Sequence, residues 1–76
     1  MGEYTFEGKA ITTHVQTEVL DRLAGLAIGY KALSKAKVVK DALAQEGYIK
    51  GFLYCLETLG TISPEESQEL YEFFVT

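Results

Sequence analysis

The sequence has one cysteine (Cys55), one proline (Pro64) and no tryptophan among its 76 residues. A lone cysteine excludes an intrachain disulfide and a metal site built from several cysteines, so a reducing compartment is expected. No apolar run approaches the ~20 residues needed to cross a bilayer. Met1 is followed by Gly-Glu-Tyr, whereas a secretory leader opens with a basic segment followed by an apolar one. We therefore expect one small domain that is soluble and cytoplasmic, with no membrane contact.

Cations are also scarce, with seven Lys and Arg against eleven Asp and Glu and a net charge of -4. Most nucleic-acid binders have a basic face, so this balance argues at first against such a partner. The excess of acidic groups is confined to residues 47–76, where Lys50 is the only cation, because residues 1–46 carry both signs equally. Four of the seven basic residues form a cluster, which comprises Lys31, Lys35, Lys37 and Lys40.

Residues 10–15 alternate, which is the pattern of a short strand with one buried face. One side carries Ile11, Thr13 and Val15, and the other carries Ala10, Thr12 and His14. From Thr17 the period changes to three and four residues, which is typical of a helix with one apolar stripe. Its members are Val19, Leu20, Leu23, Leu26 and Ala27. We expect this helix to begin at Thr17, as a cap, and to end near Ile28, with Gly29 as the stop.

A second helix is predicted after a turn over residues 30–33, with Ser34 as its N-terminal cap. Its apolar stripe includes Val38, Val39, Ala42 and Leu43. The helix either continues through Gly47 or bends there, and Gly60 marks its end. A last helix is expected from Pro64 to Phe74, because Ser63 and Glu66 form the pattern of a capping box.

Residues 1–9 form an N-terminal arm with two open interpretations. Tyr4 and Phe6 alternate with polar residues, so the arm is compatible with a strand. A two-residue turn at Gly8-Lys9 would fold this arm back on residues 10–13 as a hairpin. Such a hairpin would occupy an edge of the strand.

The order of strand, helix, turn and helix over residues 10–43 resembles the ribbon-helix-helix family of Arc-, MetJ- and CopG-type DNA-binding proteins. The segments that carry the resemblance are the alternating strand, then Val19-Leu20-Asp-Arg-Leu23-Ala-Gly-Leu26-Ala27, then Leu33-Ser34-Lys35 and Val38-Val39-Lys-Asp-Ala42-Leu43. The resemblance implies a mostly α fold in which a short strand pairs with that of a symmetry mate and two core helices complete an obligate dimer. It divides the chain into residues 1–9, a DNA-binding domain over 10–46, and an acidic, aromatic helical extension over 47–76.

The resemblance also implies a set of site residues. The dimer core would comprise Ile11, Thr13, Val15, Leu20, Leu23, Val39 and Leu43. Base contacts in the major groove would come from Ala10, Thr12 and His14. Phosphate contacts at the start of the second helix would come from Leu33, Ser34, Lys35 and Lys37. The implied function is a dimeric transcriptional regulator, a repressor that inserts a β-ribbon in double-stranded DNA.

Simpler interpretations stay open beside these. Thr12 and His14 also suit the solvated face of a structural strand, and the lysine cluster suits a solvated surface. Cys55 is expected to be a small buried hydrophobe. No second histidine, cysteine or paired acid stands at ligand spacing to His14, so we expect no enzyme activity, no catalytic residues, no cofactor and no metal. The aromatics of residues 47–76 have three open interpretations: a structural cap on the core, a surface for dimer–dimer contacts along an operator, or a surface for another protein. In the alternative function this region binds a partner protein, as an antitoxin binds its toxin.

Overall fold

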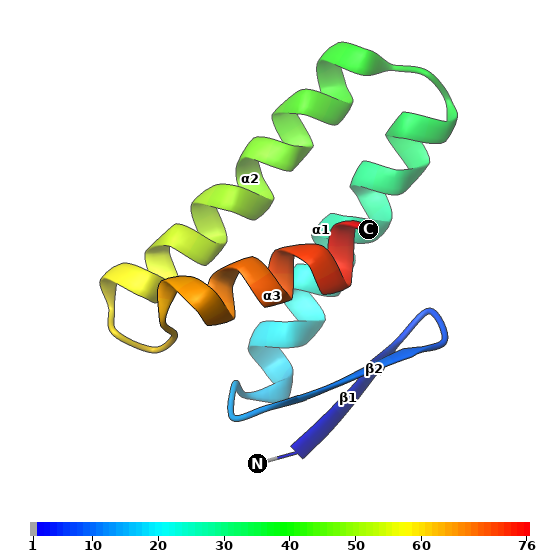
Figure 1. Ribbon diagram of the computed structural model, residues 1–76. Coiled ribbons are helices and arrows are strands. Elements are labelled where there is room, and N and C mark those ends of the chain that lie inside the picture. Colours follow the sequence, from blue (N-terminus) through cyan, green and yellow to red (C-terminus); the bar gives the residue numbers. More distant parts are fainter. Residues whose placement is uncertain (1) are drawn as a thin grey trace.

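The computed structural model describes residues 2–76, so Met1 of the predicted arm lies outside the described residues. Two strands, β1 (Gly2–Phe6) and β2 (Lys9–Thr13), precede three helices, α1 (Thr17–Lys35), α2 (Val39–Thr58) and α3 (Pro64–Val75). Figure 1 shows α1 and α2 side by side, with α3 crossing them near one end and the strands beneath. The described chain is mostly helical, as predicted.

The two strands form an antiparallel hairpin within one chain. Gly2 pairs with Thr13 and Phe6 pairs with Lys9, so the turn is Glu7-Gly8. Both turn residues have positive φ, 50° and 79°, which is the geometry of a two-residue turn that matches the twist of the strands. The hairpin interpretation is therefore confirmed, with its turn one residue earlier than predicted. Within the described chain the partner of β2 is β1, which occupies one of its two edges. The expected pairing of β2 with a symmetry mate stays a prediction.

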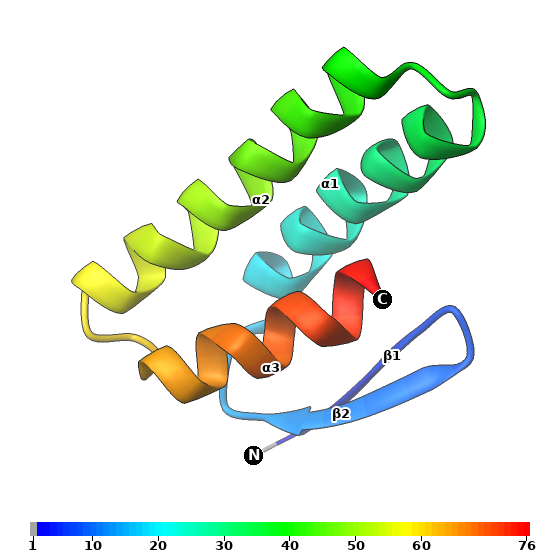
Figure 2. The same ribbon diagram turned by 45° about the horizontal axis from the view of Figure 1, so that its top comes forward.

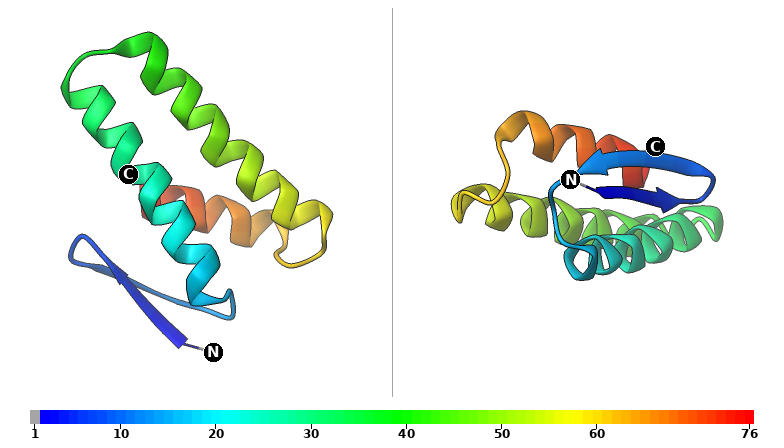
Figure 3. Two further views of the ribbon diagram at one scale, coloured as in Figure 1. Left: turned by 180° about the vertical axis from the view of Figure 1, so that it is seen from behind. Right: turned by 90° about the horizontal axis from the view of Figure 1, so that it is seen from below.

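Aromatic side chains hold the hairpin on α3. The ring of Phe6 lies 5.1 Å from that of Phe74 and 6.3 Å from that of Phe73, and Tyr4 lies 6.0 Å from Phe74. The Lys9 ammonium also donates to the Phe73 carbonyl at 2.6 Å. In the view from below (Figure 3, right), the hairpin lies against both α3 and α1. These contacts bury one face of the hairpin within the chain.

Helix α1 begins near the predicted residue, although Gln16, and not Thr17, is its N-terminal cap. The helix does not end at Gly29 but continues to Lys35, and the chain turns at Lys37, whose φ is 61°. A glycine inside a helix costs only about 1 kcal/mol relative to alanine, and packing along α2 outweighs that cost. The predicted turn over residues 30–33 and the Ser34 cap are both wrong, because these residues belong to α1.

Helix α2 runs through Gly47 and Gly51 without a break and ends before Gly60, whose φ is 76°. It starts at Val39 and not directly after Ser34. The capping box of α3 is confirmed, because the Ser63 hydroxyl accepts from the Glu66 N–H and the Glu66 carboxylate accepts from the Ser63 N–H. Sequence-local signals therefore located the start of α3 correctly.

The core is built inside the chain from all five elements or their flanks. Its most buried members include Leu20, Leu23, Ala27, Ile49, Leu53, Leu70 and Phe74. Of the predicted dimer core, Val15, Leu20 and Leu23 are buried, and Ile11 and Thr13 are half-buried on the inner hairpin face. Val39 and Leu43 are exposed. The alternation of β2 is thus confirmed, but its inner face meets the chain's own helices.

Candidate interaction surface

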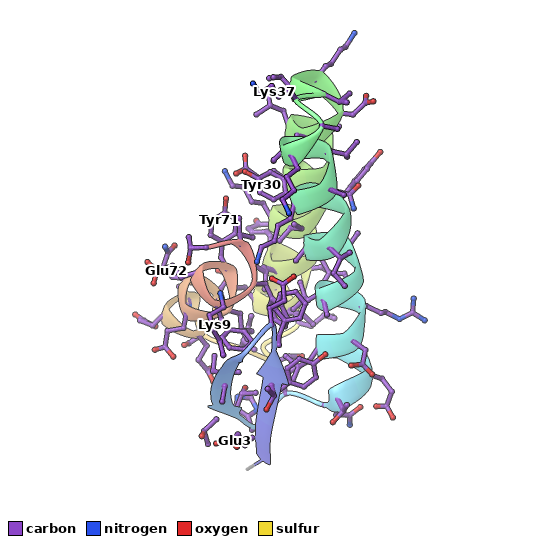
Figure 4. All side chains as sticks on the ribbon, turned by 90° about the vertical axis from the view of Figure 1, so that its right-hand side faces the viewer. Glu3, Lys9, Tyr30, Lys37, Tyr71 and Glu72 are labelled. Carbon is purple, nitrogen blue, oxygen red and sulfur yellow. The ribbon has the colours of Figure 1, made fainter. Side chains whose placement is uncertain are left out.

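The predicted base-contacting residues lie on the outer face of the hairpin. Ala10, Thr12 and His14 are exposed, as expected. In the register of the hairpin, however, Thr12 lies opposite Glu3 and Ala10 lies opposite Thr5. A carboxylate on this face opposes contact with DNA phosphates. Figure 4 shows Glu3, which belongs to β1, at the end of the molecule that the hairpin forms, and it shows Lys9 between the hairpin and α3.

His14 has a partner of its own. Its Nε2 atom lies 2.8 Å from Oε2 of Glu66 at the start of α3. The hydrogen bond from the Ser63 backbone and then the bond with His14 lower the pKa of Glu66 below its ordinary value. This pair ties the chain before α1 to the first turn of α3, which gives His14 a structural role.

The predicted phosphate contacts do not stand at a helix start. Leu33, Ser34 and Lys35 lie in the last turn of α1, and Lys37 lies in the turn that follows. The last turn of a helix presents carbonyl groups and the negative end of the dipole, so it offers no phosphate site of the predicted kind. A helix of 19 residues is about 28 Å long, so Ser34 lies far from His14. Figure 4 shows Lys37 and Glu3 at opposite ends of the molecule.

Other site chemistries find little support in residues 2–76. No group of three or more His, Cys, Asp or Glu residues in this part of the chain is placed to hold a metal ion. Burial and a bond to Asp21 raise the pKa of Tyr4 to about 12, and a bond to Glu46 together with burial raises that of Tyr71 to about 12. Both phenols therefore act as hydrogen-bond donors between elements. None of the described helices is long and apolar enough to cross a membrane.

The most unusual surface is the side of α2 that faces away from α1 and α3. We call it the outer face of α2, and it comprises Lys40, Leu43, Ala44, Gly47, Tyr48, Gly51, Tyr54 and Cys55, with Val39 and Leu59 exposed at its two ends. Leu43 is 62% exposed, Tyr54 is 69% exposed and Leu59 is 72% exposed. The prediction that Cys55 is buried is wrong, because it is exposed on this face. Figure 2 shows no other element over this side of α2.

The outer face also lacks charge along most of its length. Between Leu43 and Leu59 the charged residues are Glu46, Lys50 and Glu57. Glu46 accepts a hydrogen bond from Tyr71 at 2.6 Å, and the Lys50 ammonium lies 3.7 Å from Glu46 and near the Tyr71 ring. Glu57 is half-buried and lines the hollow between α2 and α3. The three charged side chains between Leu43 and Leu59 thus lie toward α3, whereas Lys40 and Asp41 are exposed in the first turn of α2.

Sequence reasoning assigned Val39 and Leu43 to the core because they continue an apolar stripe. The stripe that is buried contains Ala42, Ile49, Leu53 and Leu56. A helix that has apolar residues on two sides signals a second contact surface, and that signal was present in the spacing of residues 39–59.

Comparison of this chain with protein-family models, curated proteins and solved structures found no match.

Proposed function

We propose that this chain is a protein-interaction module, without enzyme activity, that docks a protein helix on the outer face of α2. The observation that carries the proposal is the exposure of Leu43, Tyr48 and Tyr54 on a side of α2 that the rest of the described chain leaves uncovered. Full burial of a leucine-sized side chain contributes roughly 1.5–3 kcal/mol, so covering this face would stabilise a complex. Contiguous apolar surface of this kind marks interaction sites in small proteins.

The proposal places the protein-binding surface on α2, which lies partly outside the predicted range of residues 47–76. Phe73 and Phe74 pack on the hairpin and Tyr71 bonds to Glu46, so these aromatics serve the fold. Tyr48 and Tyr54 are the aromatics of this region that stay exposed. Tyrosine is enriched in protein interfaces because it combines a large apolar ring with a hydrogen-bonding group.

DNA binding by a repressor dimer stays a second prediction, and fewer residues support it than in the sequence analysis. What favours it is the exposed position of Lys35, Lys37 and Lys40 around the turn between α1 and α2. A basic patch supplies affinity for phosphates without sequence readout. Because β1 and β2 pair within one chain, only the other edge of β2 is left for a ribbon shared by two chains.

Site-specific photo-crosslinking in the organism that encodes the protein tests the two functions together. A benzophenone amino acid at Tyr54 reports the outer face of α2, and the same group at Thr12 reports the outer face of the hairpin. We expect protein adducts from position 54 and a background level from position 12. Absence of a position-54 adduct would contradict the proposal, and DNA adducts from position 12 would favour the regulator.

A further inference from the structure

We infer that the helix docked on the outer face of α2 is α2 of a second copy of this chain, running antiparallel, with the symmetry axis at the level of Ile49. The inference rests on the proposed function and names the partner of the same surface. It differs from the ribbon-helix-helix dimer, because the strands take no part in it.

The sizes of the side chains favour this arrangement. Every fourth residue along the outer face belongs to one row, which is Val39, Leu43, Gly47, Gly51, Cys55 and Leu59. Rows at this spacing are the ridges through which helices most often pack. An antiparallel pair centred on residue 49 brings Gly47 opposite Gly51 of the second copy and Leu43 opposite Cys55 of the second copy. The four central residues of the row share one side of the helix, and its smallest members meet in the middle.

The two glycines permit the helices to approach closely. A Cβ atom added at Gly47 or Gly51 would meet no heavy atom within 4 Å. The chain's own packing therefore does not require glycine at either position. The distance between two packed helices depends on the side chains at their contact, and glycine gives the shortest distance while Tyr48 and Tyr54 contact the second copy beside it.

The charges select the second copy and the antiparallel direction. Residues 35–41, at the start of α2, carry Lys35, Lys37 and Lys40 against Asp41 alone. Residues 57–66, from the end of α2 to the start of α3, carry Glu57, Glu65 and Glu66 and no cation, and of these Glu66 is already paired with His14. An antiparallel pair places the basic end of each chain beside the acidic end of the other. The two helix dipoles then point in opposite directions, which is the favourable arrangement for neighbouring helices. A parallel pair would bring like charges together at both ends.

The length of the chain adds to the argument. A domain of this size buries only about 60% of the surface that its unfolded chain exposes. A second copy offers an apolar surface of matching length, and it is present wherever this chain is present. An interface made by one helix from each copy is near the lower size limit for specific complexes, so the association is expected to depend on concentration.

Sedimentation equilibrium with a matched pair of variants tests the contact. Gly51→Gln places a long side chain on the outer face of α2, and Gly25→Gln places the same side chain on the exposed face of α1, where a Cβ also meets nothing within 4 Å. We expect the intact chain and Gly25→Gln to form dimers, and Gly51→Gln to raise the dissociation constant by about tenfold or more, which corresponds to 1.4 kcal/mol or more. Circular dichroism verifies that each variant stays folded.

Each other result overturns the inference. If the intact chain is a monomer at all concentrations, or if Gly51→Gln and Gly25→Gln dimerise equally, α2 does not pair with its copy. The proposed function would survive that result, provided that the photo-crosslink at position 54 reaches a different protein. Loss of both the dimer and the position-54 adduct would reject the function and the inference together.

Oxidative crosslinking tests the direction. In the antiparallel pair Cys55 lies opposite Leu43 of the second copy, whereas the two Cys55 residues are separated by about 18 Å along the axis. We expect Leu43→Cys to form a disulfide-linked dimer, and the intact chain to form none. Leu43→Cys combined with Cys55→Ser is the control and should also form none. A covalent dimer of the intact chain, or none from Leu43→Cys, would contradict the antiparallel arrangement.

Discussion

Gly29 of α1 lies directly against Gln45 of α2, so closely that a Cβ atom at Gly29 would lie 3.0 Å from the amide nitrogen of Gln45. That amide donates to the Leu26 carbonyl at 3.2 Å and so links the two helices. The contact gives Gly29 a role in packing, and it shows why a glycine inside the sequence pattern did not end α1.

A larger residue at Gly29 should therefore weaken the fold. Gly29→Leu is expected to lower the free energy of unfolding by about 1–3 kcal/mol, as overpacking does, measured by urea denaturation at low protein concentration. The control is Gly25→Leu, at an open position of the same helix, which should be neutral or stabilising because leucine favours helix. Equal effects of the two variants would show that the Gln45 contact has no energetic role.

The packing of Phe74 against the hairpin predicts a large loss of stability when the Phe74 ring is removed. Phe74 is fully buried and contacts the rings of both Tyr4 and Phe6. Phe74→Ala is expected to cost about 3–5 kcal/mol and to free the hairpin from α3. Loss of the near-ultraviolet circular dichroism and a lower midpoint of thermal unfolding would report this. A variant with unchanged stability would contradict the intrachain burial of the hairpin.

The lowered pKa of Glu66 predicts sensitivity to acid. A carboxylate whose pKa is lower in the folded chain adds stability above its unfolded pKa, here close to the ordinary value of 4.5, and this stability is lost as the pH falls through the lowered value. We expect the intact chain to lose stability below that pH, measured by urea denaturation at several pH values. Glu66→Gln should flatten this part of the profile. An unchanged acid limb in the variant would contradict the assignment to Glu66.

Binding to DNA is open to a direct test. Because Glu3 lies opposite Thr12 on the outer hairpin face, we expect a gel-retardation assay with the DNA upstream of the gene to show no shift at moderate salt. Any gel shift at low salt should be independent of the DNA sequence, since it would come from phosphate contacts of the lysine cluster. A sequence-specific shift that Thr12→Glu abolishes would restore the regulator interpretation.

The parts of the fold that sequence predicted are those set by local chemistry. Ser63, Pro64 and Glu66 determine the start of α3 through bonds within one turn, and the alternation of residues 10–13 determines which side of β2 faces inward. The pairing of β2 was not determined locally, because it depends on Tyr4 and Phe6 meeting Phe74 from the other end of the chain.

The site was predicted less well than the fold, for a related reason. Val39 and Leu43 were assigned to a core because apolar spacing does not distinguish a buried face from a face that awaits a partner. Ser34 was assigned as a cap because it follows a glycine and a turn-like segment, but the packing of α1 on α2 carries the helix past both residues. Tertiary contacts decided each of these cases.

The most direct test of the central claim, that this chain associates through the outer face of α2, is the concentration dependence of its amide NMR spectrum. Raising the concentration should move the signals of Leu43, Gly47, Gly51 and Tyr54, and it should leave those of Thr5 and Thr12 in place. Signals that move only on the hairpin, or a spectrum that does not change at any concentration at which the chain stays in solution, would contradict the account.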